Sequence, residues 1–130
     1  EHLLDLRTAV AEMARVLRPG GILTVDTIHR TTISRLLSVE IPENWLGLLR
    51  PNTHDWRLFI TPAELQAVML ASGFQTNVSM YMEMAPDLRM VVEVLLISLG
   101  WIRIEEAKGS FVIGGSPMMS YVATAKKPLL

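Results

Sequence analysis

A turn of one proline and two glycines, Pro19 to Gly21, constrains the fold of this chain more than any other feature. Before the turn, apolar residues recur at steps of three and four, a spacing that predicts an amphipathic helix over residues 3–17. Pro19 and the glycines cannot continue that helix. After the turn, residues 22–27 are rich in β-branched side chains and predict a strand covered on both faces in a parallel sheet. A helix that leads into such a strand indicates an α/β fold.

The rest of the chain continues in short elements, and we expect residues 1–130 to form one unit. The clearest of these elements is a helix over residues 62–72, because Thr61, Pro62 and Glu64 have the order of a capping box with proline at the first helical position. The other expected elements are a mostly helical insertion over 31–49, a loop over 52–60, a strand over 76–84, a helix over 86–99, and a hairpin in which 102–106 or 111–113 pairs with 119–125.

Composition excludes several classes of protein. A formal net charge of −1 gives no basic footprint, so we expect no nucleic-acid partner. The absence of cysteine excludes disulfide-stapled folds, thiolate metal sites and cysteine nucleophiles. The longest apolar stretch, residues 90–102, is shorter than the roughly 20 residues that span a bilayer. We therefore expect a globular protein with a cytoplasmic location.

Two motifs carry a resemblance to a known family. The first is the predicted helix followed by Leu17-Arg18-Pro19-Gly20-Gly21 and the strand, and the second comprises Thr53-His54-Asp55-Trp56, Phe59, Pro62, Glu64 and Leu65. With these motifs the chain resembles class I S-adenosylmethionine-dependent methyltransferases, and within them the ubiquinone-biosynthesis O-methyltransferase-like branch. Residues 1–75 carry the resemblance, and residues 119–127 are similar to the family's last strand.

The resemblance implies that the chain is the C-terminal half of a Rossmann-like class I sheet. That half would contain one parallel strand and then an antiparallel edge, with residues 31–50 as a substrate-side helical insertion. The family's glycine-rich cofactor loop is not found here, because Gly20-Gly21 and Gly114-Gly115 lack its strand-to-helix context. We therefore expect the main S-adenosylmethionine site to lie outside this chain, and the chain alone to be inactive.

Glu1 and His2 are the candidate metal ligands. They match the last two positions of a Glu-x-x-Glu-His motif of the family, which implies a divalent cation such as Mg²⁺. A cation held against a catechol would lower the pKa of the acceptor hydroxyl. The alternative is that both residues cap the following helix and complement its dipole.

His54 and Asp55 are the candidate catalytic residues, since a histidine with a carboxylate partner can act as a general base for a hydroxyl. Adjacent side chains rarely point at each other, and the alternative is that Asn52 and Asp55 form turn bonds while His54 packs. Asp26 ends the predicted parallel strand, where open α/β sheets bind ligands. It could equally cap the next segment.

The insertion is rich in apolar residues, Trp45 among them, with arginines such as Arg30 at intervals, and we place Arg30 and Trp45 on the substrate side. Such a mixture suits a lid over a hydrophobic substrate or a segment that lies on a membrane surface. Ordinary core packing is the third interpretation. Glu40 and Glu43 argue against strong membrane adsorption.

These observations predict O-methylation of a phenolic or other small hydrophobic acceptor. Two alternatives stay open: a methyltransferase with a nitrogen, carbon or other small-molecule acceptor, and a non-catalytic α/β fragment that acts as an interaction module. The strand over residues 22–27 would also expose an apolar sheet edge if it lacked a neighbour. We therefore expect self-association of the isolated chain.

Overall fold

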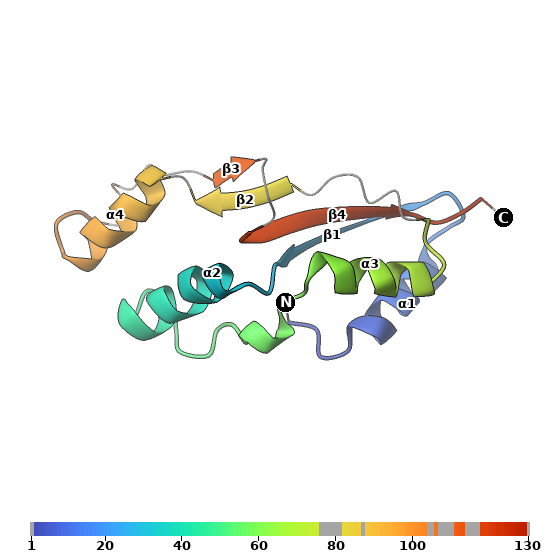
Figure 1. The fold of residues 1–130 in the computed structure, drawn as a ribbon, viewed down its shortest axis with the longest axis horizontal. Helices are drawn as coiled ribbons and strands as arrows, with labels where there is room; N and C mark the ends of the chain where they lie inside the picture. Colours follow the sequence, from blue (N-terminus) through green and yellow to red (C-terminus); the bar gives the residue numbers. More distant parts are fainter. Residues whose placement is uncertain are drawn as a thin grey trace.

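The structure is a computed structural model, and it describes residues 2–75, 82–86, 88–103, 106, 111–113 and 118–129. Its centre is a four-stranded sheet in the order β1-β4-β2-β3. Helices α1 (Leu6–Val16) and α3 (Pro62–Ala71) lie on one face of the sheet, and α4 (Leu88–Ser98) extends from its far end (Figure 1). No helix of the described chain is both long and apolar enough to cross a membrane.

The first helix and the turn after it follow the prediction closely. Asp5 caps α1 by accepting a hydrogen bond from the Thr8 N–H at 3.0 Å, so the helix starts three residues later than the apolar spacing suggested. Gly20 has a φ of 76°, and a Cβ on Gly21 would lie 2.7 Å from Leu17 Cγ and 2.9 Å from the Arg18 carbonyl oxygen. Both glycines are therefore required by the turn.

Strand β1 (Ile22–Ile28) pairs antiparallel with β4 (Ser120–Lys126) along its whole length, from Ile22 opposite Lys126 to Ile28 opposite Ser120. No strand in the described residues runs parallel to it, so the parallel neighbour stays a prediction. The expected cover on both faces is not found in this structure. Exposure alternates along the strand, with Ile22 65% exposed and Thr27 buried, which is typical of a strand packed on one face.

The expected C-terminal hairpin is wrong. Strand β3 (Phe111–Ile113) pairs with β2 (Met82–Pro86) and not with β4. The reason is that β1 occupies one edge of β4, while β2 occupies the other through Met82 opposite Val122. Ile102 and Arg103 are not in a strand. The predicted strand over 76–84 is described only from Met82, and its residues 76–81 lie outside the described part of the chain.

The core lies between the two helices and the β1–β4 pair. Alternate residues of β4, Tyr121, Ala123 and Ala125, face it, and the two alanines leave room for the helices above them. The Tyr121 hydroxyl donates to the Ile60 carbonyl at 3.1 Å. Thr61 and Glu64 form the predicted capping box at the start of α3. The helical partners in this core are Val10, Ala14, Leu65 and Met69.

The end of β4 is fastened to the end of α1 by a lysine. Lys127 Nζ donates to the carbonyl oxygens of Ala14 at 2.6 Å and Leu17 at 2.7 Å. These carbonyls belong to the last turn of the helix, which has no intrahelical donors left for them. A cation at this position also complements the negative end of the helix dipole. The side chain thus joins the two ends of the described fold.

We expect Lys127→Met to lower the free energy of unfolding by about 2 kcal/mol, because two hydrogen bonds from a charged donor are lost. The matched control is Lys126→Met, which removes the same charge from an exposed neighbouring side chain. Urea unfolding followed by circular dichroism measures both. Equal losses in the two variants would show that the contacts of Lys127 with α1 contribute nothing.

Candidate functional site

The candidate site lies beyond the carboxyl end of β1, in a segment that leaves the sheet and returns to the same point. The Ile60 N–H donates to the Ile28 carbonyl at 3.1 Å, so the two ends of the segment meet. Between them lie the short helix α2 (Thr32–Arg35), the π-helix η1 (Leu36–Trp45) and the 3₁₀ turn η2 (Trp56–Leu58). The segment is helical over residues 32–45, as expected, and it stands at one end of the sheet (Figure 1).

A buried carboxylate, Glu43 of η1, organises this segment. One oxygen accepts from the Thr53 N–H at 3.1 Å, and the other accepts from the His54 N–H at 2.9 Å and lies 3.0 Å from His54 Nδ1. The Glu43 side chain is 1% exposed, and that of His54 is 19% exposed. The loop backbone and the imidazole therefore close around a single carboxylate.

The electrostatics favour an ionised Glu43. Burial is the largest influence on its pKa and raises it, but the hydrogen bonds from the His54 side chain and from the His54 and Thr53 N–H groups together bring the pKa below its ordinary value. An ionised carboxylate only accepts hydrogen bonds, so Nδ1 of His54 is the donor. In the neutral ring, Nε2 is then the nitrogen that can accept a proton.

Two further rings surround His54. The His2 ring is stacked on it with centroids 6.0 Å apart, and the Phe59 ring meets it edge-on at 6.3 Å. The structure therefore brings together His2 and His54, which the sequence analysis had treated as separate candidates. Glu1 lies outside the described residues. Within the described chain, no group of three or more histidine or carboxylate side chains could hold a metal ion.

Asp55 is directed to another partner. Its two carboxylate oxygens accept from Arg57 Nε at 3.0 Å and Nη2 at 2.9 Å, and the carboxylate also accepts from the Arg57 N–H at the start of η2. These hydrogen bonds lower the pKa of Asp55. The carboxylate beside the candidate base is thus Glu43, while Asp55 fixes the turn that follows.

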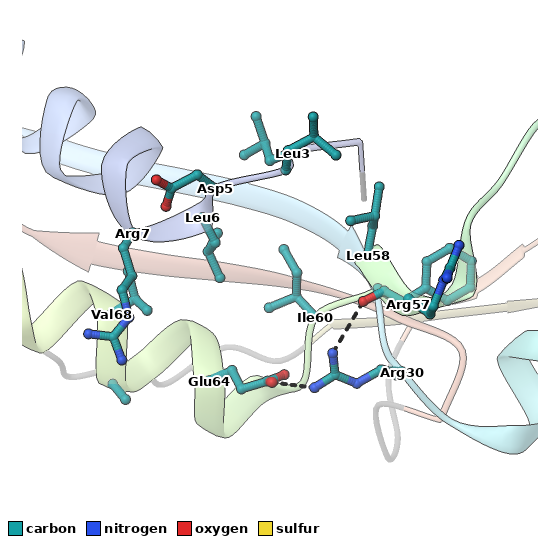
Figure 2. A pocket seen from close by; sticks show the side chains of 13 residues that line it. Leu3, Asp5, Leu6, Arg7, Arg30, Arg57, Leu58, Ile60, Glu64 and Val68 are labelled. Atoms are coloured by element: carbon teal, nitrogen blue, oxygen red, sulfur yellow. Dashed lines mark hydrogen bonds and ion pairs between the residues drawn. The ribbon is translucent and has the colours of Figure 1, made fainter.

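The remaining candidates are spread around the same end of the sheet. Arg30 forms an ion pair with Glu64 of α3 and also donates to the Arg57 carbonyl at 3.4 Å (Figure 2). Asp26 is exposed on β1, opposite Val122 of β4. Trp45, at the end of η1, is 68% exposed. Arg30 therefore connects the segment after β1 to α3.

Glu43 was not among the site residues predicted from the sequence. It was considered only as a charge that opposes membrane adsorption, because no motif joins a glutamate to a histidine eleven residues later. The available signal was that carboxylates, Glu40 and Glu43, occur in an otherwise apolar helical segment. A charge in such a place needs a hydrogen-bonding partner nearby.

Comparison with known proteins gives matches over more than half of the chain. It is 34% identical over 82 residues to the mitochondrial ubiquinone biosynthesis O-methyltransferase of Bos taurus, which covers 62% of this chain and 22% of the relative. It is 40% identical over 77 residues to the ubiquinone biosynthesis O-methyltransferase of Azorhizobium caulinodans, covering 59% of the chain and 30% of the relative. The corresponding protein of Thiobacillus denitrificans is 41% identical over 77 residues, with 59% and 33% covered.

These matches confirm the resemblance to the ubiquinone-type branch. The chain spans only 22–33% of the length of these three relatives. No protein-family model matches the chain. No solved structure matches it either.

We expect Glu43→Gln to lower the free energy of unfolding at pH 7 by about 1–3 kcal/mol, because the amide cannot satisfy the same three donors. The pKa of Glu43 is lowered in the folded protein. Its stabilising contribution is therefore full above the usual glutamate pKa of about 4.3 and is lost as the pH falls through the lower, folded value. The difference between wild type and variant should shrink correspondingly in urea titrations between pH 7 and pH 3.

The control is Glu40→Gln, three residues earlier on η1. Glu40 also has a lowered pKa, caused by hydrogen bonds from Asn44 and Arg35, but these lie at the surface, where ion pairs add little. Equal pH dependence in the two variants would contradict a special role for Glu43.

Proposed function

We propose that this chain is part of an S-adenosylmethionine-dependent O-methyltransferase whose acceptor is a phenol or another small hydrophobic molecule. The observation that carries the proposal is the 34–41% identity to ubiquinone biosynthesis O-methyltransferases over about three fifths of the chain. The names of the relatives describe whole proteins, of which the chain matches less than two thirds. The sequence contains the candidate base His54 but not the family's glycine-rich cofactor loop, so we assign to this chain the acceptor side of the reaction.

His54 is the proposed general base. As the acceptor oxygen forms its bond to the methyl carbon, the bond from that carbon to sulfur breaks and the electron pair stays on sulfur. The hydroxyl proton passes to His54 Nε2, because Nδ1 is engaged by Glu43. Glu43 is a positioning residue, which holds the ring and stabilises the imidazolium that forms. Most of the acceleration would come from alignment of the two substrates.

S-adenosylmethionine would supply the methyl group, and we assign no described residue of this chain to its binding. Assistance by Mg²⁺ through Glu1 and His2 has no support from the described residues. The proposed step assigns the hydroxyl proton to His54. The His2 ring instead stacks on the ring of the proposed base.

Residues 31–50 would cover the acceptor. Trp45 is exposed at the end of η1, and Arg30 and Asp26 lie near the start of the segment. A second use of the same surface is peripheral membrane contact, which the exposed Trp45 and the partly exposed Leu48 and Leu49 favour. Co-sedimentation with lipid vesicles tests that use. The predicted cytoplasmic location stays a prediction.

The alternatives differ in measurable ways. A nitrogen or carbon acceptor would keep cofactor binding but change which product carries the methyl group. A non-catalytic interaction module would transfer no methyl group to any acceptor. The identities with O-methyltransferases favour oxygen as the acceptor atom.

Transfer of labelled methyl groups from S-adenosylmethionine to catechols tests the proposal, with this chain and with any longer product of its reading frame. We expect transfer in a form that binds the cofactor, and a loss of about a hundredfold or more in kcat for His54→Gln. Asp55→Asn is the matched control and should keep most of the activity, because Asp55 bonds to Arg57. Activity that survives in His54→Gln but not in Asp55→Asn would overturn the assignment.

We also propose that the outer edge of β1 pairs with another strand. On the described chain this edge has no ladder partner, since β4 occupies the opposite edge. In a class I sheet, a parallel neighbour would lie there; in the isolated chain, a second copy would. Sedimentation velocity of the isolated chain should therefore show concentration-dependent association. A monodisperse monomer would contradict this expectation.

A further inference from the structure

A hollow lies between α1 and α3, and neither His54 nor Glu43 lines it. It consists of two cavities of about 440 and 320 Å³ that share Arg7, Ala67 and Val68. We call this continuous hollow the α1–α3 groove. Each cavity is within the range of roughly 300–1,000 Å³ that small-molecule sites occupy.

The walls of the larger cavity are mainly apolar. Leu3 precedes α1 and Leu6 begins it, Leu58 and Ile60 come from η2 and the loop after it, and Val68 comes from α3 (Figure 2). The smaller cavity continues along the helices past Ala11 and Ala71. Small side chains keep this part open, so a short aliphatic chain could lie along it.

The charged groups of the groove differ in their pairing. Asp5 accepts from Thr8 at the start of α1. Arg30 is paired with Glu64, and Arg57 is paired with Asp55, which lies outside the groove. The Arg7 guanidinium forms no hydrogen bond or close ion pair in the described part of the chain, although the Arg7 N–H and the Arg7 charge both help to lower the pKa of the nearby Asp5 carboxyl. Figure 2 shows the Arg7 side chain extending from α1 toward Val68 of α3.

We propose that the α1–α3 groove binds a small amphiphile with an oxyanion headgroup. Arg7 would hold the carboxylate or phosphate through its planar guanidinium, which presents paired donors to such groups. The aliphatic tail would lie against Leu6, Ile60 and Val68. A cationic or neutral headgroup would leave the guanidinium unmatched, so the groove selects for negative charge.

Isothermal titration of octanoate, octyl phosphate and octanol into the chain tests the proposal. We expect saturable binding of at least one anion, and binding of octanol weaker by about tenfold or more, because one charge-assisted contact accounts for such a factor. Arg7→Met should weaken anion binding by a similar factor. Arg15→Met is the matched control on α1, since Arg15 is paired with Glu12 and lies outside the groove.

A second pair of variants tests the apolar part. Ala67→Trp should fill the space shared by the two cavities and abolish binding, whereas Leu70→Trp, on the same helix outside the groove, should not. Circular dichroism establishes that each variant is folded. Binding of octanol as tight as that of the anions, no binding of either anion, or equal binding by Arg7→Met and Arg15→Met would each overturn the proposal.

Discussion

The pairing of β1 with β4 is the constraint on which the rest of the structure depends. These strands come from opposite ends of the described chain, and their seven paired positions hold the two ends together. The ladder presents Tyr121, Ala123 and Ala125 to α1 and α3, so the core exists only once the ladder has formed. Such contacts between distant parts of a sequence form slowly compared with local helices. The helices α1 and α3 and the β1–β4 pair therefore share one core.

The segment between β1 and α3 depends on a different kind of interaction. Its helices expose several apolar side chains and contribute little to the core, and its centre is the charged group of Glu43. A buried carboxylate is costly unless its hydrogen bonds are complete, so the loop at Thr53 and His54 has a single favourable conformation around it. The same requirement fixes the orientation of the imidazole. The feature that gives this segment its shape thus also prepares the proposed base.

Local features of the fold were predictable from the sequence, and pairings were not. The turn at Gly20 and Gly21, the capping box at Thr61 and the strand from Ile22 are each determined by neighbouring residues, and the structure contains all three. The partner of β3 was predicted wrongly, because pairing depends on which strand edges remain free after distant strands have met.

The candidate site shows the same limit. His54 was predicted from its motif, but the carboxylate expected beside it was Asp55. Sequence proximity suggested that pair, whereas the hydrogen bonds of η2 turn Asp55 toward Arg57. Glu43 reaches His54 only because a π-helix and a returning loop bring them together. The spacing of these residues along the chain does not indicate that they are in contact.

The hydrogen bond between Ile60 and Ile28 has a consequence for how proteins of this design can diversify. A hydrogen bond between Ile60 and Ile28 joins the two ends of the segment between β1 and α3. The length and composition of this segment can therefore change without a change in the distance between β1 and α3. Closing a longer loop costs little additional entropy. The segment is therefore exchangeable, and a different set of residues between positions 28 and 60 could present a new surface while the sheet and its helices stay as they are.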